Sequence, residues 1–114
     1  MDKLYEQTML FDFYGELLTE HQRRVYEDAV YNDLSLSEIA EEQGISRQGV
    51  HDLIKRCDKI LKDYEAKLHL VAKFMKIKEM AGELERLSDE CIRTRDMALI
   101  DQIRRLSAEI TSTL

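Results

Sequence analysis

The chain has 114 residues, no proline, only four glycines and 35% charged residues, and its formal net charge is −6. A chain of this length forms one small core, or a core with a helical arm, and this composition favours helices throughout. No apolar run approaches the roughly 20 residues that cross a bilayer, and two distant cysteines are too few for a disulfide framework, so we expect a soluble cytoplasmic protein with reduced thiols.

The first third of the chain predicts two amphipathic helices. Residues 3–17 carry apolar side chains at helical spacing, and a second helix is expected over 20–32. Thr19 and Gln22 form the pattern of a capping box, in which each side chain satisfies the other residue's backbone amide. The apolar stripe of the first helix is Leu4, Thr8, Phe11, Tyr14 and Leu18.

Residues 36–56 show the spacing of a helix-turn-helix. Ser35 and Glu38 predict a second capping box, and Gly44 allows the positive φ at which the chain leaves the first helix, which ends near Gln43. Ser46 caps a longer helix, expected from Arg47 to about Tyr64. Ala40 permits close approach of the two helices, and the residues expected to fill the corner between them are Ile39, Ile45, Val50 and Leu53. Gln43 departs from the motif, because the position directly before the glycine is usually apolar.

The outward side of this longer helix is the candidate binding surface. Arg47, Gln48, His51 and Lys55 precede or interrupt the apolar positions, as the side chains of a DNA reader do. Arg47 and Gln48 could contact bases, and Lys55, Arg56 and Lys59 could hold phosphates. A solvated helix face is an equally good interpretation for Arg56 and Lys59. Asp52, on the same face, would have to accept from a cytosine amino group or a basic partner.

Charge is distributed unevenly along the chain. Residues 1–45 hold 3 Lys/Arg and 11 Asp/Glu, residues 46–67 hold 6 and 4, and residues 68–114 hold 8 and 8. The basic excess therefore falls on the second helix of the motif, but few basic groups are available to neutralise phosphates. We expect weak or conditional binding to nucleic acid.

The last third of the chain predicts an antiparallel helical hairpin. Two seams with steps of three and four residues flank a polar break at residues 93–96, where Thr94 or Asp96 can cap the second helix. The alternative is that these seams dimerise, and we expect a homodimer that covers apolar side chains left over by the hairpin. The predicted division is a helix-turn-helix domain over 1–66 and a hairpin or dimerisation arm over 67–114. The two seams are Ile77, Met80, Leu84, Leu87 and Cys91, and Leu99, Ile103, Leu106, Ile110 and Leu114.

No pattern points to catalysis, a metal or a cofactor. The three histidines lie on different predicted helices and neither cysteine has ligand-like spacing from them, so no zinc site is expected. The glycines are isolated rather than grouped in a phosphate-binding loop. We expect a non-catalytic protein, with Cys57 as a small buried apolar residue.

Several segments resemble known families. Residues 17–22 with 36–56 resemble region 4 of bacterial sigma factors, which implies an all-α, sigma region 4-like core and contacts with promoter DNA. A closer resemblance, over roughly residues 1–80, is to the YlxM family of small bacterial proteins, carried by the five segments FDFY at 11–14, LLT at 17–19, EIAEE at 38–42, SRQ at 46–48 and YEAKLHL at 64–70.

The YlxM resemblance implies a regulator of protein targeting, because its members are typically encoded beside the signal recognition particle GTPase. Two functions are therefore expected as alternatives. One is an adaptor that docks on that GTPase, its receptor or its RNA, and the other is a regulator that binds duplex DNA. Gly49 stands where we expect Ala in the family. Glycine in place of alanine destabilises the longer helix of the motif by about 1 kcal/mol.

Overall fold

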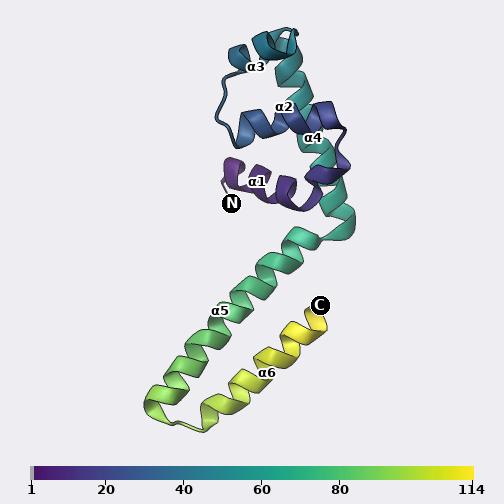
Figure 1. Ribbon diagram of the computed structural model, residues 1–114. Coiled ribbons are helices and arrows are strands. Elements are labelled where there is room, and N and C mark those ends of the chain that lie inside the picture. The colour runs from purple at the N-terminus through teal and green to yellow at the C-terminus, as the bar shows by residue number, and fades with distance from the viewer. Residues whose placement is uncertain (1) are drawn as a thin grey trace. The chain divides into compact units, whose positions relative to one another are not determined.

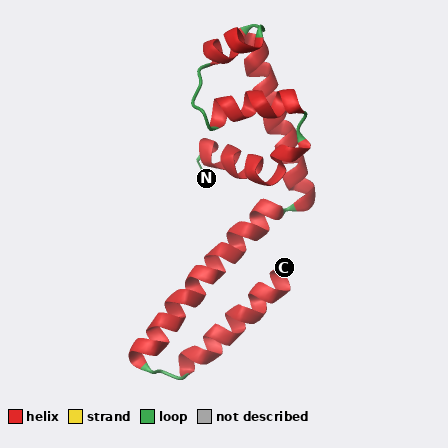
Figure 2. Ribbon diagram, in the orientation of Figure 1, coloured by secondary structure: helices red, strands yellow, loops and turns green. Residues whose placement is uncertain are grey.

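The computed structural model describes residues 2–114, and within them every regular element is helical (Figure 2). The all-α prediction is confirmed. The chain divides into two compact units, one ending at His69 and one spanning Leu70–Leu114. His69 adopts a left-handed conformation, with φ of 57°, and thereby ends the long helix of the first unit.

The first unit packs three short helices and a 3-10 turn against one long helix (Figure 1). The elements are α1 (Lys3–Tyr14), η1 (Gly15–Leu17), α2 (Glu20–Val30), α3 (Leu36–Gln43) and α4 (Arg47–Leu68). The first predicted helix thus ends at Tyr14, and its last three expected residues form the 3-10 turn. α4 continues about one turn beyond the expected end near Tyr64.

The predicted caps of this unit are present. Thr19 with Gln22, and Ser35 with Glu38, form complete capping boxes. The backbone hydrogen bond from Ser35 to the Glu38 carboxylate, reinforced by the Ser35 side chain, lowers the Glu38 pKa.

All four α-helices of the first unit contribute to its core. Its largest fully buried side chains come from all of them and are Tyr14, Tyr26, Ile39, Leu61, Val25, Val50 and Cys57. Two buried tyrosines donate to carboxylates on α4: Tyr14 to Glu65 and Tyr26 to Asp58, each at 2.5 Å. Gln7 of α1 donates to the same Asp58 oxygen at 3.0 Å. These bonds fix the register of α1 and α2 along α4.

Two expected core positions are wrong. Leu4 is 52% exposed, because the buried stripe of α1 passes through Met9, Leu10 and Tyr14 instead. Ile45 is 38% exposed, because the turn directs it away from the corner between α3 and α4. Leu34, Leu36 and Ile54 pack there, together with the predicted Leu53.

The second unit is the predicted hairpin of α5 (Leu70–Thr94) and α6 (Ala98–Thr113), which pack along each other (Figure 1). Asp96 fulfils the predicted capping role, since its carboxylate accepts the Ala98 amide at 3.0 Å. Met80, Leu87 and Leu99 of the predicted seams are buried. Leu114 is 83% exposed and does not extend the second seam.

Candidate partner-binding surface of the helix-turn-helix

The turn between α3 and α4 has the geometry expected of the motif. Gly44 ends α3 with φ of 68°, a left-handed conformation that most side chains avoid. Ser46 caps α4 by accepting the Gly49 amide at 2.9 Å. Ile39, Ala40, Val50 and Val25 of α2 form the buried cluster beneath the turn. The first turn of α4 is therefore held rigidly and presents its outward side chains to solvent.

All six predicted binding residues are exposed, but they do not form one surface. Arg47, Gln48 and His51 line a shallow depression of about 440 Å³ together with Leu36 of α3. Lys55 and Lys59 line a second depression of about 430 Å³ farther along α4. Arg56 lines neither of them, because adjacent residues leave a helix about 100° apart.

Sequence reasoning missed two lysines of the second depression. Lys62 continues the stripe of Lys55 and Lys59 at helical spacing, so the sequence contained the signal that would have found it. Lys3 belongs to α1, and only the packing of α1 on α4 brings it beside them. Asp58 and Asp63 line the same depression.

Carboxylates occupy much of this helix face. Gln48 donates to Asp52 at 2.9 Å, and His51 Nδ1 lies 3.8 Å from the same carboxylate oxygen. Lys59 lies 3.6 Å from Asp63, and Lys62 lies 3.9 Å from Glu6 of α1. A partner that engages these side chains has to displace or accommodate their carboxylates.

Three predicted cations form no ion pair with a carboxylate of the described chain. Within residues 2–114, no carboxylate oxygen lies within ion-pair distance of Arg47, Lys55 or Arg56. Arg47 lies in the first depression and Lys55 in the second. These two side chains are therefore the cations of the exposed face that an anionic partner can engage at the smallest cost.

The first helix of the motif carries the opposite charge. Glu38, Glu41 and Glu42 of α3 line a depression of about 370 Å³ with Leu34. Glu38 caps its own helix, whereas Glu41 and Glu42 are exposed and make no ion pair within the described chain. In DNA-bound helix-turn-helix proteins this first helix crosses the phosphate backbone. An acidic α3 repels phosphates and attracts a basic surface.

The thiols and the possible metal ligands suggest no reactive site in the described chain. Cys57 is fully buried, as predicted, and burial raises its pKa to about 11. Among residues 2–114, the His, Cys, Asp and Glu side chains form no group of three or more that could hold a metal ion. No helix in that range is long and apolar enough to span a membrane.

Comparison with known proteins assigns the chain to a family. Residues 1–108 match the family model UPF0122, described as "Putative helix-turn-helix protein, YlxM / p13 like". A UPF0122 protein of Halalkalibacterium halodurans is 43% identical over 93% of this chain and 98% of its own length. A UPF0122 protein of Acetivibrio thermocellus is 51% identical over 74% of this chain and 72% of its own length. A UPF0122 protein of Streptococcus thermophilus is 38% identical over 90% of this chain and 94% of its own length.

The match extends well beyond the resemblance seen in the sequence, which stopped near residue 80, and includes most of the hairpin. The hairpin is thus shared with relatives rather than being a separate addition. The chain belongs to the UPF0122 family of YlxM/p13-like helix-turn-helix proteins.

Proposed function

We propose that the protein is a non-catalytic, cytoplasmic regulator of the signal recognition particle pathway, which uses its helix-turn-helix unit to dock on the particle's GTPase, its receptor or its RNA. The observation that carries the proposal is the charge of the motif itself. Among residues 2–114, the exposed Glu41 and Glu42 of α3 form no ion pair, and carboxylates already contact Gln48, His51 and Lys59 on α4.

This charge arrangement favours a protein partner over a DNA duplex. Duplex affinity grows with the number of phosphates that Lys and Arg neutralise, and of the predicted cations only Arg47, Lys55 and Arg56 form no ion pair among the described residues. A partner with a basic patch gains from the acidic α3 at the same time. The assignment to this pathway rests on the YlxM resemblance, because members of that family are typically encoded beside the targeting GTPase.

The experiment is a GTPase and binding assay with the purified particle GTPase and its receptor, each with and without the particle RNA. We expect the protein to bind one of these components or to change GTP turnover. The double substitution Glu41→Gln and Glu42→Gln should weaken a protein contact, because it removes two charges from α3. Glu79→Gln with Glu109→Gln on the hairpin is the matched control, since it changes the net charge equally. No binding and no change in turnover would reject the proposal.

The alternative function is a transcriptional regulator that reads promoter DNA, and the geometry of Arg47 and Lys55 favours it. If it is correct, Lys55→Ala should weaken binding to all duplexes. It should also reduce the slope of log affinity against log salt concentration by about the amount expected for one phosphate contact. Arg47→Ala should change preference at one base pair by about 1 to 3 kcal/mol. Lys67→Ala, in the last turn of α4, is the control. Submicromolar binding of the wild type to a defined duplex in physiological salt would decide for this alternative.

A further inference from the structure

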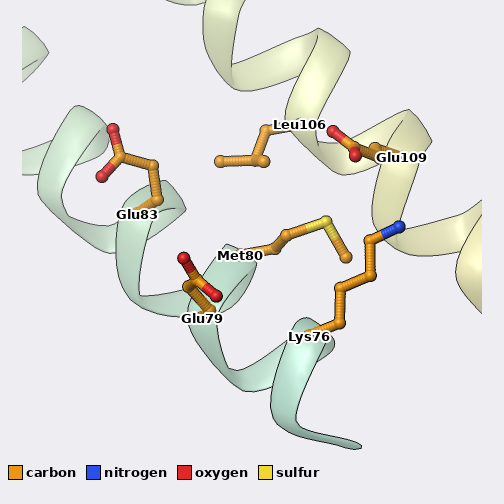
Figure 3. Close-up of a pocket in the computed structure, with 6 residues that line it drawn as sticks. All are labelled: Lys76, Glu79, Met80, Glu83, Leu106 and Glu109. Atoms are coloured by element: carbon orange, nitrogen blue, oxygen red, sulfur yellow. The ribbon is translucent and has the colours of Figure 1, made fainter. Parts of the chain in front are cut away.

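The two long flanks of the hairpin differ in charge. On one flank, Lys76, Glu79 and Glu83 of α5 face Glu109 of α6 around Met80 and Leu106, in a groove of about 380 Å³ (Figure 3). The groove continues past Glu83 and Leu87 toward Gln102 and Arg105. Arg86 forms ion pairs with Glu83 and Glu90, and the bond to Glu83 lowers the pKa of that carboxyl. This flank is rich in charge of both signs.

The opposite flank carries no charged side chain at its central positions. A step of one residue turns a helix by about 100°, so the residues next to Lys76, Met80 and Glu83 lie on the other side of the α5–α6 seam. Ala81 of α5 is exposed on this side although α6 packs on α5. On α6, Ile100 and Ser107 follow the seam residues Leu99 and Leu106, and both are exposed, Ile100 by 44%. The central positions of this uncharged flank are Ile77, Ala81, Leu84 and Ser88 on α5, and Ile100, Ile103 and Ser107 on α6.

Small and large side chains alternate along the uncharged flank. Along α5 the order is Ile77, Ala81, Leu84 and Ser88, with steps of four, three and four residues. A ridge of large residues on one helix fits hollows above small residues on another, so this surface can pack closely against a copy of itself.

Two charges border this flank on α5. Lys78 and Glu85 lie seven residues apart on one side of the helix, and neither has an ion-pair partner among the described residues. Their midpoint falls between Ala81 and Gly82. If two α5 helices pack antiparallel across that point, Lys78 of each copy lies opposite Glu85 of the other.

We propose that the occupant of the uncharged flank is a second copy of this chain, and that two hairpins form an antiparallel four-helix bundle with the two-fold axis beside Ala81. A two-fold interface brings each residue on the axis against its own copy, so central charges would repel and small uncharged residues fit. The bordering charges of α5 are complementary to themselves under the same rotation. Arg104 of α6, which is exposed and lies between Ile100 and Ser107, also borders the flank. This inference is independent of the partner of the helix-turn-helix unit.

The first test is sedimentation equilibrium of the full chain at tens of micromolar. We expect a dimer for the wild type, and a monomer for Ala81→Arg, because two arginines would meet at the axis. Ala81 is exposed, and Arg is a good helix former, so the hairpin itself should fold. Gln102→Arg makes the same change at an exposed position on the charged flank, and this control should remain dimeric.

The second test is a charge exchange. Lys78→Glu should weaken the dimer about tenfold, because it places two like-charge pairs across the axis. Adding Glu85→Lys should restore the affinity by recreating both pairs in reverse order. Circular dichroism would show that helix content is unchanged in each variant.

Three results would overturn the inference. They are a wild type that is monomeric at these concentrations, an Ala81→Arg variant that dimerises as tightly as the wild type, and a double exchange no tighter than Lys78→Glu alone. Because none of these measurements involves the targeting GTPase or DNA, their outcome is separate from that of the proposed function.

Discussion

The two units of the chain bury their large side chains to different degrees. In the unit that ends at His69, seven large side chains are less than 2% exposed, and buried tyrosines reach carboxylates on α4. In the hairpin no large side chain reaches that degree of burial, and Leu87 is its most buried residue at 4%. Four α-helices can enclose a core, whereas two helices cover only one side of each other. The first unit buries its largest core side chains, whereas the hairpin leaves apolar side chains such as Ile100 exposed.

The two thiols should give the largest difference between the units. Cys57 is fully buried in the core and its pKa is raised to about 11, while Cys91 of the hairpin is partly exposed. We expect Cys91 to react with a thiol reagent about a hundredfold faster than Cys57 at neutral pH. The Cys57→Ser variant should lose only the slow phase. Equal rates in the folded protein would show that the core is not closed.

The same thiol makes the core sensitive to alkali. A raised folded-state pKa means that the folded state holds the proton more tightly than the unfolded state. The stabilisation is therefore complete below the ordinary thiol pKa near 9 and is lost as the pH rises through about 11. Urea unfolding at increasing pH should show this decline, and it should be smaller in Cys57→Ala.

Truncation of core side chains should be costlier in the first unit. Ile39→Ala should lower the free energy of unfolding by about 2 to 5 kcal/mol, because Ile39 is fully buried beneath the turn. Leu106→Ala in the hairpin should cost about 1 to 2 kcal/mol, since that side chain is only half-buried. Ile45→Ala is the control at an exposed position and should cost less than either. Urea unfolding followed by circular dichroism measures all three.

Polar contacts should follow the same order. Tyr26→Phe should cost about 1 to 3 kcal/mol, because it removes a buried hydrogen bond to the Asp58 carboxylate. Arg86→Ala breaks two ion pairs on the hairpin but should cost less than Tyr26→Phe, since exposed ion pairs are screened by water. Tyr31→Phe removes the hydrogen bond to Asp12 at an exposed site, and it should fall near the Arg86 value. A Tyr26→Phe variant as stable as the wild type would contradict the structural role of Asp58.

Replacement of two glycines by alanine should give the smallest changes in stability, and the two changes should differ in sign or size. Gly82→Ala should stabilise α5 by about 1 kcal/mol, because the added methyl group meets nothing and alanine is the better helix former. At Gly49 the added Cβ would lie 3.1 Å from the Ser46 hydroxyl that caps α4. Gly49→Ala should therefore gain less than Gly82→Ala, or lose stability. Thermal unfolding of the two variants side by side decides this.

Local features of the sequence predicted the helices and their caps. The two capping boxes, Gly44 and Ser46 depend on residues within four positions of each other, so their geometry could be read without tertiary information. The hairpin followed from the period of its two seams. The sequence predicts that Gly49 loosens α4, whereas the structure places it where the Ser46 cap of that helix leaves little space for a side chain.

The sequence by itself determined the fold class, the helix-turn-helix and the apolar faces, because these depend on periodicity and short-range hydrogen bonds. Only the tertiary structure decided which faces meet. Packing of α1 on α4 brought Lys3 to the basic depression and Gln7 to Asp58, and the turn left Ile45 exposed. Docking of α6 on one side of the α5 stripe divided the hairpin into a charged and an uncharged flank. These choices depend on contacts between residues far apart in the chain, which periodicity does not encode.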